Sequence, residues 1–338
     1  MIFSYRTRQI IKNTAIIALA VILVLTLVLG CWFVWLDRYV VYTRDGAVID
    51  FGLSGFGPGV QAVRPEEEDP ASIYYNEGEN TINTSTELTQ IIGYYVDAAA
   101  LEEDIEAVRE QIRRLPSGTP VMVDVKSIYG NFFYSSGVSE KRNPQIDTEA
   151  MDSLIKLMQT NELYAIARLP GLRDYYYGLN HVSDGLPMPG GYLWTDEDYC
   201  YWLNPASDGT KTYLAQIIVE LRNLGFDEVV LKDFYFPDED DIVFKGDREQ
   251  AIADAAETLV VACATDKFAV SFMGRTPTFS LPEGRSRLYL ENVAAADAAG
   301  AAVQSGIENT EVNLVFFTDV HDTRFDVYSV LRPLSAAH

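Results

Sequence analysis

Hydrophobic positions follow two different patterns along the chain, and the first is a long uncharged run near the N-terminus. No charged side chain lies between Lys12 and Asp37, and residues 15–35 are almost all aliphatic or aromatic. A helix needs roughly 20 apolar residues to cross about 30 Å of hydrocarbon. The run therefore predicts a transmembrane helix over residues 13–36.

Charges on either side of this run indicate its orientation. Arg6, Arg8 and Lys12 precede it with no acidic neighbour, and cytoplasmic flanks of membrane helices carry an excess of positive charge. We expect residues 1–12 in the cytoplasm, a single pass through the cell membrane, and an extracytoplasmic remainder. A lipoprotein cleavage before Cys31 is the alternative, but the apolar run continues past that cysteine.

The segment after the run predicts a small hairpin and then a linker. Apolar residues at 40–42 and 47–51 flank Asp45-Gly46, a dipeptide suited to a tight turn. The following stretch is rich in glycine and in acidic residues, which have little to bury and repel each other. We therefore assign residues 37–88 to a β-hairpin and acidic linker, and residues 89–338 to a folded domain.

Within that domain, short apolar runs alternate with segments whose apolar residues recur every three or four positions. This alternation is typical of βα units. The expected strands cover residues 91–96, 121–125, 164–168, 226–236, 268–272, 288–290 and 312–317. Asn204 is expected to cap the helix after the third strand, and Asp247 with Gln250 resembles a capping box.

The strand pattern favours the α/β class and a (β/α)8 TIM-type barrel. A barrel needs eight strands and about 250 residues, and seven strands are visible, so the barrel is expected to be incomplete or irregular, or to take its eighth strand from the C-terminal tail. A doubly wound sheet is the alternative, but it would usually show a glycine-rich first turn, which this chain lacks.

Charge and composition exclude several classes of protein. The 338 residues include 49 acidic and 26 basic side chains, a formal net charge of −23, and so acidic a surface repels the phosphates of nucleic acids. The three histidines show no paired ligand spacing, so neither a metal nor a cofactor is predicted. Cys200 and Cys263 are compatible with one disulfide bond or with two free thiols.

Polar residues that follow strands are the candidate site, because active sites of such barrels lie at the carboxyl ends of the strands. They are Asp124, Lys126, Arg168, Arg173, Asp174, Asp233, Glu291, Asp319, His321 and Asp322. Two carboxyl groups facing each other across a cleft can hydrolyse a glycosidic bond. We take Asp233, with Glu291 or Asp319, as the predicted catalytic pair. The alternative, that these acids are helix caps and rim ion pairs, stays open.

Aromatic residues crowd one loop between the third strand and its helix. They are Tyr175, Tyr176, Tyr177, Tyr192, Trp194, Tyr199, Tyr201 and Trp202. Flat rings can stack on the apolar faces of sugars, and they can equally form the small core that a long loop needs.

Five short motifs occur in one order along the chain. They are Gly93-Tyr94-Tyr95-Val96, Val123-Asp124-Val125-Lys126, Ile166-Ala167-Arg168, Trp202-Leu203-Asn204-Pro205, and Gly225-Phe226-Asp227-Glu228 leading to Phe236-Pro237. Together they resemble the putative glycosyl hydrolase domain family of bacterial exported proteins, a TIM-barrel group distantly similar to α-amylase-type glycosidases. The resemblance covers residues 93–237.

The resemblance implies a membrane-anchored, extracytoplasmic glycoside hydrolase acting on envelope or secreted polysaccharide. Asp124, Lys126, Arg168 and Asn204 match the family, and we expect them to bind substrate together with Asp174, Trp194, Trp202 and Tyr235.

One departure concerns the fourth strand, which in the family carries Phe-Asp-Tyr, an aliphatic residue, Arg and Phe-Pro. Here Lys232 takes the place of the acid and Tyr235 that of the arginine. Because side chains alternate along a strand, Asp233 would point away from the site unless a bulge restores its direction. A barrel that binds glycans or envelope proteins without cleaving them is therefore the second hypothesis.

Overall fold

A computed structural model describes residues 40–43, 46–49 and 88–334. The chain divides into two units, 1–72 and 73–338. In the first unit, β1 (Val40–Thr43) and β2 (Gly46–Ile49) form the predicted antiparallel hairpin. Thr43 pairs with Gly46, so this glycine belongs to the second strand.

The predicted membrane helix, residues 13–36, and the predicted linker beyond the hairpin lie outside the described residues. Among the residues that are described, no helix combines the length and the apolar character that a membrane crossing requires.

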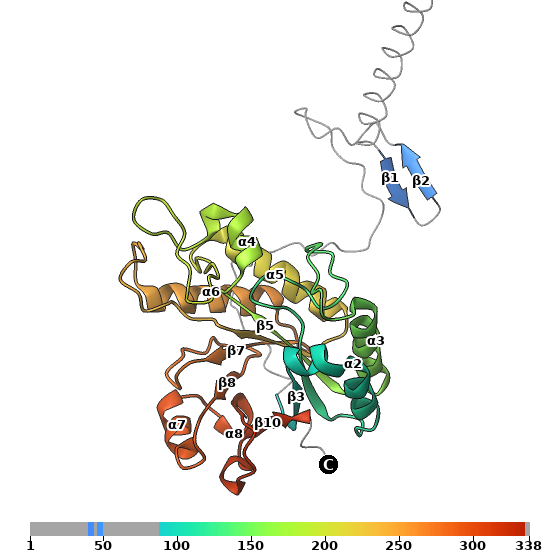
Figure 1. Cartoon of the computed structure of the whole chain (residues 1–338). Helices are drawn as coiled ribbons and strands as arrows, with labels where there is room; N and C mark the ends of the chain where they lie inside the picture. The colour runs from blue at the N-terminus through green and yellow to red at the C-terminus, as the bar shows by residue number, and fades with distance from the viewer. Residues whose placement is uncertain (1–39, 44–45, 50–87, 335–338) are drawn as a thin grey trace, which may run out of the picture. The chain divides into compact units, whose positions relative to one another are not determined.

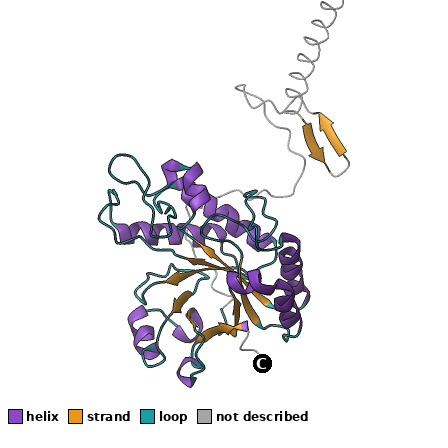
Figure 2. Ribbon diagram, viewed as in Figure 1, coloured by secondary structure: helices purple, strands orange, loops and turns teal. Residues whose placement is uncertain are grey.

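The second unit is a closed barrel of eight parallel strands, in the order β10-β3-β4-β5-β6-β7-β8-β9 (Figures 1 and 2). The strands are β3 (Ile92–Val96), β4 (Pro120–Asp124), β5 (Tyr164–Pro170), β6 (Glu228–Lys232), β7 (Ala269–Gly274), β8 (Leu288–Glu291), β9 (Leu314–Phe317) and β10 (Ser329–Pro333). The predicted TIM-type α/β fold is thus confirmed, and the eighth strand is supplied by the C-terminal tail. The strand expected at 226–236 is shorter than predicted.

Helices cover the outside of the barrel unevenly (Figure 1). They are α2 (Ala98–Arg113), α3 (Thr148–Thr160), α4 (Tyr175–Asn180), α5 (Asp208–Asn223), α6 (Arg248–Cys263), α7 (Ala298–Ser305) and α8 (Thr310–Asn313), with the 3-10 turns η3 (Val182–Asp184) and η4 (Thr323–Phe325). The connection between β7 and β8 contains no helix, and α7 and α8 have only 8 and 4 residues. The second half of the barrel is therefore irregular.

Two helix starts test the predicted caps. The cap of α5 is Ser207, whose side chain accepts from the Gly209 N–H, so the prediction of Asn204 as the cap is wrong. Asn204 instead accepts from the Ala206 N–H at 3.0 Å, a local turn that such a side chain forms readily. Asp247 does cap α6, accepting from the Gln250 N–H at 3.0 Å.

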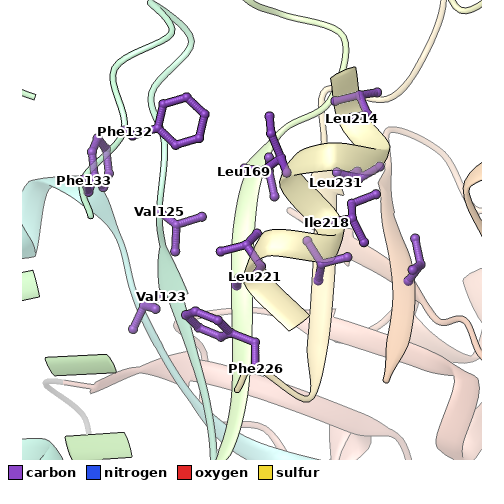
Figure 3. Close-up of a cluster of buried hydrophobic side chains, with 14 of the residues drawn as sticks. Val123, Val125, Phe132, Phe133, Leu169, Leu214, Ile218, Leu221, Phe226 and Leu231 are labelled. Atoms are coloured by element: carbon purple, nitrogen blue, oxygen red, sulfur yellow. The ribbon is translucent and has the colours of Figure 1, made fainter. Parts of the chain in front are cut away.

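Alternation along the strands separates two apolar layers. Leu169 and Leu231 point outward and pack against Leu214, Ile218 and Leu221 on one face of α5 (Figure 3). The residues that alternate with these outward residues along each strand point inward. Met122, Ile166, Val230, Met273, Tyr289, Val315 and Leu331 pack together inside the barrel. The barrel is thus a filled core whose strand ends are free to carry polar groups.

A buried polar cluster closes the barrel at the amino ends of its strands. Glu228, the first residue of β6, is fully buried and forms an ion pair with Arg287. Its carboxylate also accepts from the hydroxyls of Tyr164 at 2.9 Å, Ser271 at 2.5 Å and Tyr289 at 3.0 Å. Because every oxygen has a donor, the buried charge is compensated, and the cluster ties β5, β6, β7 and the start of β8 together.

Glu228→Ala should destabilise the fold strongly, because it leaves the buried Arg287 without its partner. Removing one member of a buried ion pair costs about 3–5 kcal/mol. The free energy of unfolding from urea titration measures the effect. The control is Glu106→Ala, which breaks an exposed pair with Arg109 and should cost under about 1 kcal/mol. Equal losses for the two variants would contradict the structural role of the cluster.

Candidate active site at the carboxyl ends of the strands

A buried ion pair organises the opposite end of the barrel. Arg168, two residues before the end of β5, donates to Asp124 at the end of β4, with Nε–Oδ1 at 2.6 Å and Nη2–Oδ2 at 3.0 Å. Asp124 Oδ2 also accepts from the Ala98 N–H, at the start of α2, at 2.9 Å. Side-chain exposures are only 8% for Arg168 and 6% for Asp124. The pair therefore fixes the barrel mouth and leaves little of either side chain accessible to a ligand.

Further carboxyl groups gather near this guanidinium. Arg168 lies over the ring of Phe317, 4.7 Å from its centroid, and Tyr95 stacks on the same ring at 3.9 Å. Burial and the negative charges of Asp97 and Asp319 raise the pKa of Tyr95 above its ordinary value. Glu291, at the end of β8, is exposed and interacts electrostatically with Arg168. The structure thus brings Asp124, Glu291 and Asp319 to one mouth.

Asp233 reaches this mouth through an irregularity at the end of β6. Leu231 and Phe234 both pack in the outer layer, although regular alternation would separate two outward residues by one position and here two intervene. Asp233 has a φ of 52°, in the left-handed region that few residues other than glycine adopt. The backbone therefore inserts an extra residue, as a β-bulge does. Such a bulge is the irregularity that Asp233 needs in order to point into the site.

The electrostatic surroundings of Asp233 suit a proton donor. Burial raises the pKa of the Asp233 carboxyl above its ordinary value, while the positive charges of Lys232, Arg173 and Arg168 act to lower it. No hydrogen bond joins this carboxyl to another residue of the described barrel. A carboxyl group whose pKa is raised and which is not engaged elsewhere can act as a general acid.

One wall of the mouth is a row of two aromatic rings with an arginine at each end. Arg173 lies over Trp202, 5.7 Å from the ring centroid, and Trp202 packs edge-on against Tyr235 at 4.8 Å. Arg275, which follows β7, lies over Tyr235 at 4.7 Å. We call Arg173, Trp202, Tyr235 and Arg275 the cation–aromatic row. It runs from the end of β5 past β6 to the end of β7.

Asp196 holds one end of this row. It accepts from Arg173 Nε at 2.7 Å and from Trp202 Nε1 at 2.8 Å. Burial alone would raise its pKa, but the hydrogen bonds from Trp202 and the Cys200 N–H and the charge of Arg173 lower it below the ordinary value. Arg173 also pairs with Asp198 at 2.7 Å, so this arginine is fully neutralised by the loop.

The rings of the aromatic loop differ widely in exposure. Trp202 is 2% exposed and belongs to the main hydrophobic core, whereas Tyr192 and Tyr199 are 75% and 79% exposed. Trp194 is half-buried beside Trp202, with ring centroids 6.1 Å apart. The exposed rings of this loop, Tyr192 and Tyr199 above all, are the ones accessible to a large ligand.

Three residues predicted to bind substrate have other partners. Lys126 Nζ lies 2.6 Å from Asp174 Oδ2, and both side chains are only 1% exposed. Asp174 also caps α4 and accepts from the Tyr213 hydroxyl at 2.8 Å. Asn204 is engaged in its local turn. In this conformation Lys126 and Asp174 lie beneath the loop, where no substrate reaches them, and their role is structural.

The comparisons with known proteins agree with this fold. Residues 93–269 match the family described as "Putative glycosyl hydrolase domain". The chain belongs to this family. Asp124, Arg168 and Asp233 fall within the matched residues, whereas Glu291 and Asp319 lie beyond them. No curated protein matches the sequence.

Among solved structures, the barrel is similar to glycosidases of two groups. One is a GH36 α-galactosidase variant from Geobacillus stearothermophilus, with 11% identity and a TM-score of 0.52 over 74% of this chain and 39% of the other. Another is a GH20 exo-β-N-acetylglucosaminidase from Vibrio harveyi, with 9% identity and a TM-score of 0.50 over 68% and 41%. The chain thus spans about two fifths of these enzymes, and the likeness shows the fold of this glycosyl hydrolase domain.

Asp196 and Arg275 were missed by the sequence analysis of the domain. Arg275 does follow a strand, but β7 extends to Gly274, two residues beyond its predicted end at 272. Asp196 lies inside the aromatic loop, where no local pattern marks it. The thiols of Cys200 and Cys263 are both free and buried, and within residues 88–334 no group of three or more His, Cys, Asp or Glu is arranged to hold a metal ion.

Lys232→Gln should raise the pKa of Asp233 further, because the charge of Lys232 is the strongest of those that lower it. A carbon-13 NMR titration of the aspartate carboxyl groups measures the shift. Lys267→Gln is the matched control, since it removes an exposed cation at the amino end of β7. An unchanged or lowered Asp233 pKa in Lys232→Gln would show that the two groups do not face each other as described.

Proposed function

We propose that the barrel hydrolyses glycosidic bonds, with Asp233 as the general acid and Glu291 as its partner. The observation that carries the proposal is the environment of Asp233. Its backbone is left-handed directly after β6, its carboxyl forms no hydrogen bond, and the pKa of that carboxyl is raised. Family membership in a glycosyl hydrolase domain supports the reaction class.

The two carboxyl groups would act in sequence. Asp233 gives its proton to the glycosidic oxygen as the bond from that oxygen to the anomeric carbon breaks. Glu291, which is exposed, either attacks the anomeric carbon directly or removes a proton from the attacking water. Arg168 lies within electrostatic range of both. Asp319, exposed after β9, is the alternative partner.

The remaining parts of the mouth supply binding. Tyr235 presents a half-buried ring beside Asp233, and Trp194 is half-buried beside Trp202. Asp124 and Arg168 hold the strand ends in position. Fixed positions matter because a general acid must lie within about 2.6–3.2 Å of the oxygen that it protonates.

Asp233→Asn and Glu291→Gln should each lower kcat about 10²-fold to 10⁴-fold, the usual contribution of a general acid or base. Reducing-sugar release from a panel of cell-wall and capsular polysaccharides measures it. Asp266→Asn is the control, because this exposed acid lies before β7 at the amino end of that strand and should leave kcat unchanged. Binding of glycans by the wild type without any release of sugar would favour the non-hydrolytic barrel instead.

We further propose that the enzyme acts outside the cytoplasm on envelope or secreted polysaccharide, held by a membrane helix at residues 13–36. The uncharged run and its positive N-terminal flank support this anchor. The full chain should sediment with membranes, resist an alkaline carbonate wash and be released by detergent, and Cys31→Ser should not change this. Recovery of the full chain in the soluble fraction would sink the proposal.

A further inference from the structure

A cavity opens beside the proposed catalytic acid. It has a volume of about 660 Å³ and lies between the loop after β6, the loop after β7 and the first turns of α6. Its lining includes Tyr235, Phe236, Arg248, Arg275, Thr276 and Thr278. Tyr235 and Arg275 belong to the cation–aromatic row, so the cavity continues the mouth on the side of β7.

Arg275 is the chemically unusual group in this cavity. Its guanidinium is exposed and rests on the ring of Tyr235, 4.7 Å from the centroid. No carboxylate and no hydrogen-bond acceptor within residues 88–334 engages it. Five N–H donors in a rigid plane are therefore available to a ligand. Stacking on Tyr235 fixes the plane in advance, which reduces the entropy lost on binding.

Most of the other cations near the mouth have partners, unlike Arg275. Arg168 and Arg173 are neutralised by aspartates at 2.6–2.7 Å. Arg248 donates to three backbone carbonyls of the loop after β6, including that of Glu239 at 2.9 Å. Lys232, on the strand beside β7, forms no ion pair with another described residue. Two cations at neighbouring strand ends, Lys232 and Arg275, thus lack a carboxylate partner.

Carboxylates are abundant in this chain, which has 49 acidic and 26 basic side chains. Lys156 and Lys245 also form no ion pair with another described residue, so Arg275 is distinguished by its place in the cavity. Asp238 and Glu249 also line the cavity, both exposed, yet neither pairs with Arg275 within 4 Å. The hydroxyls of Thr276 and Thr278 bond to each other at 2.9 Å, which leaves one of the two O–H groups to donate to a ligand. The donors of Arg275 match the two oxygen atoms of a bidentate anion.

We propose that this cavity binds an anionic substituent of the glycan, a sugar carboxylate or phosphate, and that Arg275 is the residue that recognises it. The inference rests on the proposed function, since it names the substrate class of the same mouth: an acidic rather than a neutral polysaccharide. Arg275 grips the two oxygens of the anion, Lys232 adds its charge from β6, and the sugar ring lies against Tyr235.

The test measures binding in the Asp233→Asn background, so that it does not depend on turnover. The probes are oligogalacturonate, its methyl-esterified neutral counterpart and glucose 6-phosphate, and the readout is the dissociation constant from calorimetry. We expect acidic probes to bind more tightly than the neutral one, and Arg275→Gln to weaken their binding about tenfold or more. Tighter binding of oligogalacturonate than of glucose 6-phosphate identifies a carboxylate, and the reverse order a phosphate.

Two further variants make the result specific. Arg275→Lys keeps the charge without the planar fork and should retain only part of the affinity. Lys267→Gln removes an exposed cation from the opposite end of the barrel and should change nothing. Because Arg275 is exposed, its variants should keep the wild-type circular dichroism and melting temperature.

Failure of this inference can be told apart from failure of the proposed function. Equal binding of acidic and neutral probes, or no binding of either, overturns the inference. Hydrolysis of an acidic glycan at the same rate by wild type and Arg275→Gln also overturns it and leaves the hydrolase proposal standing. Arg275-dependent binding of acidic probes with no hydrolysis of any glycan supports the inference and overturns the hydrolase.

Discussion

The pair of Asp124 and Arg168 is the interaction on which the barrel mouth depends. It joins β4 to β5 with two hydrogen bonds and joins both to the start of α2. Taking the two charges out of water is costly, and only good geometry offsets that cost. The pair fixes the position of Arg168 at the mouth, where this arginine interacts electrostatically with both Asp233 and Glu291.

Backbone strain accompanies the two proposed catalytic acids. Asp233 itself has a φ of 52°, and Asn292, directly after Glu291, has a φ of 60°. Left-handed residues other than glycine cost about 1–3 kcal/mol each and persist only where the surroundings impose them. Here they end β6 and β8 at the mouth. Phe234, fully buried against Phe272, anchors the chain beyond Asp233, so that packing on the outside of the barrel sustains the conformation on its inside.

The limits of sequence-based prediction follow from the same residues. The barrel was predictable because apolar runs with period two and stripes with period 3.6 are local patterns. The gathering of Asp124, Asp233, Glu291 and Asp319 at one mouth followed from the rule for strand ends. The partners did not, because Lys126 meets Asp174 and Arg173 meets Asp196 through loop folding that no spacing reveals. The direction of Asp233 likewise depends on one backbone angle.

The two ends of the barrel differ in how their charged side chains are partnered. At the amino ends, Glu228 and Arg287 are surrounded by hydroxyls that satisfy the carboxylate completely, and the cluster contributes to stability alone. At the carboxyl ends, Asp233, Lys232 and Arg275 are left without hydrogen-bond partners among the described residues. Asp233 and Lys232 are half-buried and Arg275 is exposed, so solvent reaches this end of the barrel and a ligand can meet these groups there. Their concentration around one cleft, in a domain whose other end satisfies its buried carboxylate, is the physical reason to assign binding and chemistry to the mouth.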